Sequence, residues 1–488
     1  MTLALQLPLR PALPNVYGPV NFREQREIYF KIDEMLRVSG VDMDLVGTLL
    51  EARGFPSPTA RRVAWTLSGI RCAIMRRLMG VSLREFEVRL ADSMLMQWFT
   101  HCGDFGQIPP CSKSSLDRFE KSHDLSDLEN VIDTLTHMAM NPEEEERLGG
   151  LNHPLDMGDV FADCTCVKAN IHFPVDWVLL VDAVRTLMKA VLLIREQGLK
   201  HRMPEPEHFL NRINKLAISM GAARRKKDSK KARKKVLRAM KKLDKTVAGH
   251  AERYRDLLDR EWENTQWTRK EADQVLRRMD NVLEQLPAAI HQAHERIIGE
   301  RKVENKDKIL SLYEPDVHVV VRGKAGAEVE FGNKLYLAEQ CDGVIVDWKL
   351  FKDGVPTDSA MVPQSLERME LTEVGLPKGF VTDRGFTSKP NVRFLEEKGI
   401  RDGLCAKDPE ENRKRFQDPW YAETQKRRGG TEARIGIFKN VFLREVMKEK
   451  GFENRNRALI WSVLAHNLWV LARKSIADEA EREAQAAA

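Results

Sequence analysis

The placement of strand-like and helix-like segments constrains the fold of this 488-residue chain most strongly. From Leu312 onward, short β-branched and aromatic runs alternate with amphipathic helical patterns, and Gly323, Gly326 and Gly343 mark turns between the first runs. This alternation predicts an α/β fold whose sheet is antiparallel on one side and covered by helices. An earlier strand-like segment, residues 159–167, has small, β-branched or aromatic residues on both faces, so we expect it to be buried in the sheet.

The remainder of the chain has helical periodicity. Residues 20–150 place apolar side chains three and four positions apart without alternating runs, which predicts an all-α N-terminal part. Residues 177–300 return to the same pattern and predict a long helical insertion after the first strand. Charged residues at helical spacing interrupt its most apolar stretch, Trp177 to Ile194, so we predict an amphipathic helix there and no membrane span.

Basic residues are concentrated in one segment. The formal charge of +6 is small against 79 basic and 73 acidic side chains, so their distribution carries more information than their sum. In Arg224 to Lys245, thirteen of 22 residues are Lys or Arg. Like charges at this density repel one another unless a polyanion neutralises them, so we favour contact with DNA phosphates over a solvated helix face. The predicted contact residues are Lys226, Lys227, Lys230, Lys231, Arg233, Lys234 and Lys235.

A second candidate for DNA contact follows a double-proline turn at residues 109–110. Serines there are placed to cap a helix that begins near Leu116. As the second helix of a helix-turn-helix, it would bring Lys113, Arg118 and Lys121 near DNA. The pattern fits a capped helix with ordinary surface charges equally well.

Three acidic residues lie in dense local patterns. Asp163 is within the first strand-like segment, and Asp383 directly follows a later one. Carboxylates from neighbouring strands can meet at one edge of an open α/β sheet. Glu432 begins a helical register, and seven residues return almost to the same helix face, so Glu432 and Lys439 project together. Arg428 joins them if the helix extends back by one turn.

Together, these carboxylates predict a metal site. Mg²⁺ takes oxygen ligands and is often held by a few carboxylates, with phosphate and water completing its shell. Three carboxylates at one edge would suit two ions roughly 4 Å apart. Lys439 and Arg428 would then hold the reacting or adjacent phosphate. Each acidic residue alone is better explained as a surface carboxylate or a helix-start charge, so the prediction depends on all three.

The local patterns resemble those of DDE transposases of bacterial insertion sequences. In one branch of that family, the third acidic residue lies in a Y-x2-R-x3-E-x6-K signature. Arg428, Glu432 and Lys439 meet its spacing, and Gln425 stands at the Tyr position. The family's D-S-T strand and following N-I-H-x-P-x-D are similar to D-C-T and N-I-H-F-P-V-D, which begin here at residue 163 and residue 170.

Further segments extend the resemblance to about residues 80–470. The family's D-x-G-Y, followed by an Asn, is similar to D-R-G-F from Asp383, followed by Asn391. R-G-K and E-F-G-N-K segments lie between the first two acidic residues, and the helical sequence from Leu83 is similar to the domain ahead of such catalytic cores. The losses of Tyr at Gln425 and Phe386 remove hydroxyls that could orient DNA. The pair Gly429-Gly430 predicts a helix that starts at Thr431 or bends there.

The resemblance implies a ribonuclease H-like α/β catalytic core, a mixed sheet flanked by helices, with an all-α N-terminal domain and a long helical insertion. It implies that Asp163, Asp383 and Glu432 are catalytic and bind Mg²⁺, for which Mn²⁺ can substitute. Arg428, Lys439, Arg322 and Lys324 are the implied DNA contacts. The predicted segments are a DNA-binding domain at 1–155, the first core strand at 156–176, the insertion at 177–305, the rest of the core at 306–450, and a C-terminal helix and tail at 451–488.

The implied function is transposition. Such a protein binds the terminal inverted repeats of its element, cuts the DNA and joins the freed 3′ hydroxyl to another strand. The expected partners are double-stranded DNA, at the element ends and the target, and a second copy of the chain. We expect a cytoplasmic, nucleoid-associated bacterial protein that does not contact membranes. Two alternatives remain: a transposase-derived DNA-binding protein without catalysis, and a ribonuclease H-like nuclease without strand transfer.

Overall fold

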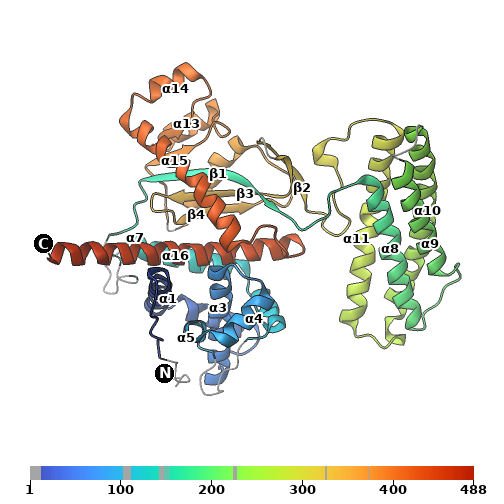
Figure 1. The fold of residues 1–488 in the computed structure, drawn as a ribbon, viewed down its shortest axis with the longest axis horizontal. Coiled ribbons are helices and arrows are strands. Elements are labelled where there is room, and N and C mark those ends of the chain that lie inside the picture. Colours follow the sequence, from blue (N-terminus) through green and yellow to red (C-terminus); the bar gives the residue numbers. More distant parts are fainter. Residues whose placement is uncertain are drawn as a thin grey trace. The chain divides into compact units, whose positions relative to one another are not determined.

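The computed structural model describes residues 12–102, 111–141, 148, 151, 153–223, 228–324, 327–372 and 374–487. It divides the chain into two compact units (Figure 1). The first comprises residues 1–167, 334–351 and 356–488, and the second comprises residues 168–333 and 352–355. The predicted limits of five segments are not tested by this division and stay predictions.

The N-terminal part of the first unit is helical across its described residues up to Met140. Its helices are α1 (Val20–Ser39), α2 (Val41–Ala52), α3 (Ala60–Met79), α4 (Leu83–Asp92), α5 (Met94–Thr100), α6 (Lys113–Glu120) and α7 (Leu125–Met140). Polar side chains start several of them: Thr59, Ser82 and Ser112 each accept a hydrogen bond from a backbone N–H in the first turn. Helix α6 therefore starts at Lys113, before the predicted start near Leu116.

Five strands form the sheet of the first unit. They are β1 (Asp159–Lys168), β3 (Ala327–Gln340), β4 (Ile345–Leu350), β5 (Gly379–Thr382) and β6 (Arg401–Leu404). Strand β3 lies between β1 and an antiparallel β4, and β1, β5 and β6 follow in that order. The pairs β1–β5 and β5–β6 are parallel. This mixed sheet is compatible with the predicted ribonuclease H-like core.

Helices cover this sheet and connect it with the N-terminal helices (Figure 1). They are α12 (Met361–Glu370), α13 (Lys389–Glu397), α14 (Pro409–Arg415), α15 (Pro419–Ile437) and α16 (Phe452–Ala487). Helix α15 packs on β5 and β6, whereas α16 contacts β4 and also α1, α3 and α7. One hydrophobic core runs through the N-terminal helices, the sheet and these helices other than α14, and it includes the fully buried Trp461. The N-terminal helices thus share their core with the sheet, and a separate N-terminal domain is not shown.

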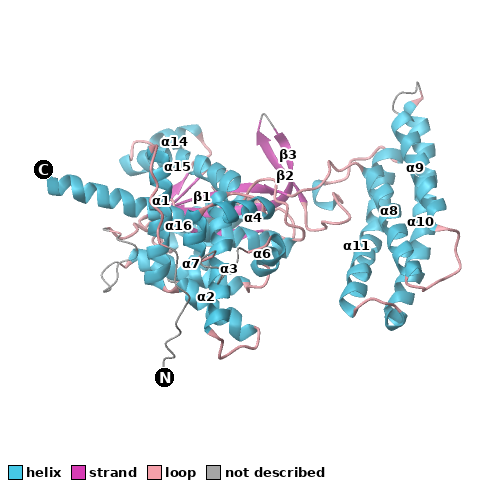
Figure 2. Ribbon diagram, turned by 60° about the horizontal axis from the view of Figure 1, so that its bottom comes forward, coloured by secondary structure: helices cyan, strands magenta, loops and turns pink. Residues whose placement is uncertain are grey.

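The second unit is mainly a group of long helices. They are α8 (Asp176–Glu196), α9 (Pro206–Ala223), α10 (Ser229–Glu261) and α11 (Arg269–Ala293), and they lie side by side (Figure 2). Leucine, valine, methionine and alanine side chains at helical spacing form their common core. After them, β2 (His318–Lys324) pairs antiparallel with the first half of β3. No helix in the described ranges is long and apolar enough to cross a membrane.

Helix α15 differs from the prediction of a helix start near Thr431. It begins at Pro419, after Asp418, whose side chain accepts a hydrogen bond from the Trp420 N–H. The helix then continues through Gly429 and Gly430 without ending. Two glycines destabilise a helix by about 1 kcal/mol each, and the cap at Asp418 and the buried contacts of the helix on the sheet offset this effect.

Candidate active site

Asp163 and Asp383 occupy equivalent places on neighbouring parallel strands. The register of β1 and β5 pairs Phe161 with Val381 and Ala162 with Thr382. The next residues are Asp163 on β1 and Asp383 directly after β5, and both side chains are partly exposed. Residues in register on parallel strands project to the same side of a sheet, so the fold places these two carboxylates together at one edge.

The turn after β5 is fixed by hydrogen bonds. The Oδ1 atom of Asp383 accepts a hydrogen bond from the Gly385 N–H at 2.8 Å. Phe386 is fully buried, and the Thr387 hydroxyl donates to the Cys405 carbonyl at 2.6 Å. Asn391, which begins α13, donates from Nδ2 to the Phe386 carbonyl at 2.7 Å. The D-R-G-F segment therefore has one conformation that orients the Asp383 side chain.

Gln425 attaches helix α15 to the same strand end. Its Nε2 donates to the Thr382 carbonyl at 3.2 Å and to the Gly403 carbonyl at 2.7 Å. Its Oε1 accepts a hydrogen bond from Arg428 Nε at 3.1 Å. A tyrosine hydroxyl could not donate two hydrogen bonds and also accept one in this way, so the departure from the family signature has a structural role here.

A buried carboxylate fixes the middle of α15 on the sheet. Glu339 of β3 accepts hydrogen bonds from Thr431 at 2.7 Å, Arg434 at 3.1 Å and Arg427 at 3.2 Å. These three positions recur along one helix face. Burial raises the pKa of Glu339 above its usual value, although Arg434 and Thr431 oppose this shift. Local sequence patterns do not point to Glu339, because only the fold brings these residues to it.

Lys439 reaches the first strand. Its ammonium donates to the Thr165 hydroxyl at 3.2 Å and pairs with Glu445 at 3.0 Å. Thr165 is two residues beyond Asp163, so both side chains project from the same face of β1. Glu432 is an exposed residue of α15, between Arg428 near the end of β5 and Lys439 near β1. Glu432 therefore lies along the chain between two contacts with the sheet, those of Gln425 and Lys439.

The three carboxylates do not form a finished ligand cluster. Within the described ranges, no group of three or more His, Cys, Asp or Glu side chains is close enough to hold a metal ion. Their donor chemistry nevertheless fits Mg²⁺ or Mn²⁺, since all three supply carboxylate oxygens. A metal site formed by these three carboxylates therefore stays a prediction.

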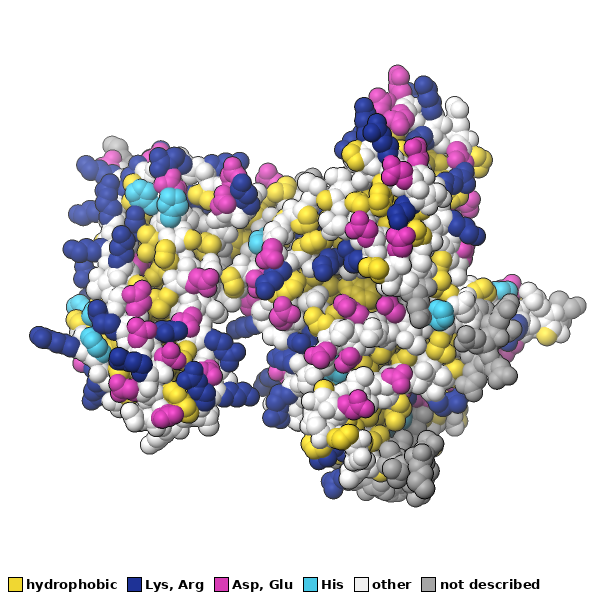
Figure 3. All heavy atoms as spheres, turned by 180° about the vertical axis from the view of Figure 1, so that it is seen from behind, with side chains coloured by type: hydrophobic (Ala, Val, Ile, Leu, Met, Phe, Trp, Pro, Cys, Tyr) yellow, Lys and Arg dark blue, Asp and Glu magenta, His cyan; other side chains and the backbone are white. Residues whose placement is uncertain are grey.

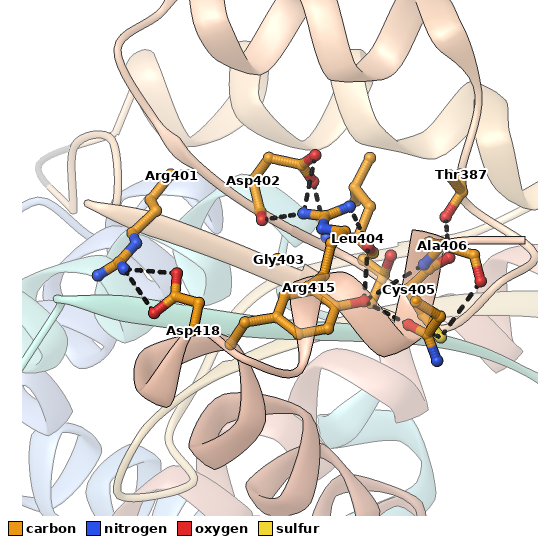
Figure 4. A network of polar contacts seen from close by, with 12 residues as sticks. Thr387, Arg401, Asp402, Gly403, Leu404, Cys405, Ala406, Arg415 and Asp418 are labelled. Atoms are coloured by element: carbon orange, nitrogen blue, oxygen red, sulfur yellow. Dashed lines mark hydrogen bonds and ion pairs between the residues drawn. The ribbon is translucent and has the colours of Figure 1, made fainter. Parts of the chain in front are cut away.

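A polar network supports the end of β6, next to this edge (Figure 4). Arg415 of α14 donates to the carbonyls of Leu404 at 2.9 Å and Asp402 at 2.5 Å. The Tyr421 hydroxyl, on α15, is 3.3 Å from the Ala406 N–H, from which it accepts. These hydrogen bonds connect α14 and α15 to the end of β6. Together with the hydrogen bonds of Gln425, they fix the position of α15 relative to Asp383.

The predicted basic segment is largely on α10. Five of its basic residues are exposed and recur four and three positions apart, opposite the buried face of the helix. We call these residues the basic stripe: Lys231, Lys235, Arg238, Lys242 and Lys245. Figure 3 shows Lys and Arg side chains gathered along one edge of the second unit. At 1.5 Å per residue the stripe is about 21 Å long, or roughly six base pairs of DNA.

The other predicted basic contacts have different environments. Lys230 and Lys234 pair with Glu300 at 3.0 and 2.7 Å, and these contacts lower the pKa of Glu300 to about 2. Arg233 is partly buried. Lys226 and Lys227 lie outside the described residues, whereas Arg322 and Lys324 are on β2 with side chains that are not described. Their predicted contact with DNA stays a prediction.

Part of the chain matches a known family. Residues 337–468 match the family model of the transposase DDE domain. This range contains Asp383, Glu432 and Lys439, but Asp163 precedes it. No curated protein matches the chain, and no solved structure does. The resemblance to DDE-type transposases is therefore confirmed, while bacterial origin and the full signature are not shown.

Proposed function

We propose that this protein is a transposase that cuts and joins DNA with divalent metal ions held by Asp163, Asp383 and Glu432. The observation that carries the proposal is the match of residues 337–468 to the transposase DDE domain, and the register of β1 and β5, in which Asp163 and Asp383 directly follow paired residues, supports it. The DNA substrate follows from that family. The recognition of terminal inverted repeats, strand transfer and action as a pair of copies are the finer parts of the proposal.

A few residues have distinct roles in the proposed reaction. A metal bound by the three carboxylates would stabilise the charge that develops on the phosphate and activate the attacking oxygen. Arg428 precedes Glu432 on α15, Lys439 follows the end of that helix, and both would hold the phosphate. In the first step water attacks a phosphodiester and leaves a 3′ hydroxyl on one product. In the second, that hydroxyl attacks a phosphodiester of another strand and displaces its 3′ oxygen, so the 5′ phosphate is joined and a new 3′ hydroxyl is left.

The basic stripe would contact DNA phosphates and would not take part in this reaction. Its residues lie on one exposed helix face, which suits a row of phosphates and carries no means of distinguishing bases. The stripe would therefore contribute affinity for any DNA. Sequence recognition would need other parts of the chain, including the region near α6 that fits either a helix-turn-helix or a simple capped helix.

The test uses a labelled duplex that carries the terminal repeat of the protein's own element, with Mg²⁺ or with chelator. We expect Mg²⁺-dependent nicking and joined products from the wild-type protein. Glu432→Gln keeps the side-chain shape and should lower nicking at least about a hundredfold, because a charged ligand is lost, with duplex binding nearly unchanged. Glu423→Gln removes an exposed carboxylate from the same helix and serves as the control.

Each outcome separates the candidate functions. Nicking without joined products would favour the nuclease. Tight duplex binding without nicking under any metal would favour a DNA-binding descendant that has lost catalysis. Nicking that persists at the wild-type rate in Glu432→Gln would remove Glu432 from the site.

A further inference from the structure

A buried lysine lies on the strand next to β1. The Lys334 side chain is only 7 % exposed, and its ammonium pairs with Asp358 at 2.5 Å. It also donates to the Pro356 carbonyl at 2.5 Å. A lysine ammonium is rarely buried unless it is paired, so the fold provides Asp358 as its counter-charge. The sequence placed Lys334 in the E-F-G-N-K segment but gave no signal for Asp358.

Asp358 adjoins the turn that carries Asp383. A Cβ atom built on Gly385 would lie 2.8 Å from Asp358 Oδ2 and 3.1 Å from Asp383 Oδ1. Both carboxylates therefore flank the same small residue, and any side chain there would displace one of them. Asn391 ties the two segments together, because its Nδ2 donates to the Ser359 carbonyl at 2.8 Å as well as to the turn.

The pair has a net charge of zero beside a proposed metal ligand. If Lys334 were absent, an uncompensated carboxylate would stand next to Asp383. If Asp358 lost its charge, an uncompensated ammonium would remain there instead. Charges a few ångströms from a partly buried site act strongly on a bound divalent cation, so the two losses should have opposite signs.

We propose that Lys334 and Asp358 are positioning residues for Asp383, which keep its turn in place and the neighbouring charge neutral. The proposal deepens the proposed function and depends on it. Neither residue needs to touch DNA or metal for this role. A purely structural ion pair would predict something different, namely a similar loss in both single variants and no dependence on the sign of the remaining charge.

The experiment measures Mn²⁺ binding to the full-length protein without DNA, from the spin-resonance signal of free Mn²⁺, and nicking of the terminal duplex in parallel. Asp358→Asn should weaken Mn²⁺ binding roughly tenfold, and Lys334→Met should strengthen it by several-fold. The double variant should return to within about twofold of wild type. Both single variants should nick more slowly, since Asp383 is displaced, and Lys334→Arg should retain most activity.

Arg368→Met is the matched control. Arg368 of α12 pairs instead with the buried Asp347 of β4 in the same unit, at 2.7 Å. We expect lower thermal stability in this variant and unchanged Mn²⁺ affinity. Equal or same-direction shifts in Lys334→Met and Asp358→Asn would overturn the inference while leaving the proposed function in place. Absence of Mn²⁺ binding and nicking in the wild-type protein would overturn both.

Discussion

Charged side chains are arranged differently in the two units. In the first, buried charges come in pairs: Arg71 bonds Asp33 and Asp42 among the N-terminal helices, and Lys334 bonds Asp358 at the sheet. In the second, the basic stripe lies on the surface, whereas the carboxylate of Asp244 is fully buried and neither of its oxygens has a hydrogen-bond partner among the other described residues. In the first unit, the effect of removing a charged residue should therefore depend on the partners that it contacts. In the second unit, the effect of removing surface charges should depend on how many are removed.

The largest effect is expected in the first unit. Arg71 is buried and donates to Asp42 at 2.9 Å and to Asp33 at 2.5 Å. Arg71→Met would leave two carboxylates buried without their shared cation, so the free energy of unfolding should fall by about 3–5 kcal/mol. Urea unfolding of the full-length protein measures this change.

The control for that variant is Arg89→Met. Arg89 pairs with Glu85 at 2.7 Å, but both side chains are about half exposed. Its loss should change the free energy of unfolding by less than about 1 kcal/mol. Equal effects of the two variants would break the contrast between buried and exposed pairs.

An intermediate effect is expected from the basic stripe. Replacing Lys235, Arg238 and Lys242 with Gln should lower affinity for any duplex roughly ten- to a hundredfold and reduce the slope of log affinity against log salt by about 3. Binding measured at several salt concentrations tests this. Replacing Arg195, Arg255 and Arg269 removes the same charge from residues that pair with acids, and should change the slope less. Equal changes would argue against a special role for the stripe.

The smallest effect is expected at Asp244. Burial raises its pKa well above the usual value. The folded state therefore binds this proton more tightly than the unfolded state, and the protein loses stability as the pH rises through the folded-state pKa. Asp244→Asn cannot ionise, so at pH 8 it should be more stable than wild type by about 1–3 kcal/mol, with little difference at pH 4. Thermal unfolding at both pH values measures this, with Asp256→Asn as an exposed control.

Much of this arrangement could be predicted from local patterns. The strand at 379–382 and the helices of the second unit follow from apolar periodicity, which the chain shows clearly. The sequence does not predict the start of α15, because the two adjacent glycines indicate a helix boundary more strongly than the cap at Asp418 indicates an earlier start. Asp358 and Glu339 could not be found, since each gains its partners from segments distant in sequence. The contacts of Gln425 and Lys439 with the sheet likewise depend on the fold and could not be found from local patterns.

Helix α16 has a consequence for the order in which the protein is made. It completes the core of the first unit by packing on α1, α3 and α7 as well as on β4. The ribosome synthesises those N-terminal helices first and α16 more than 300 residues later. Until α16 emerges, the apolar faces that it covers on those helices have no partner from this helix. The core of the first unit, and with it the active structure, is therefore complete only after α16 has been synthesised.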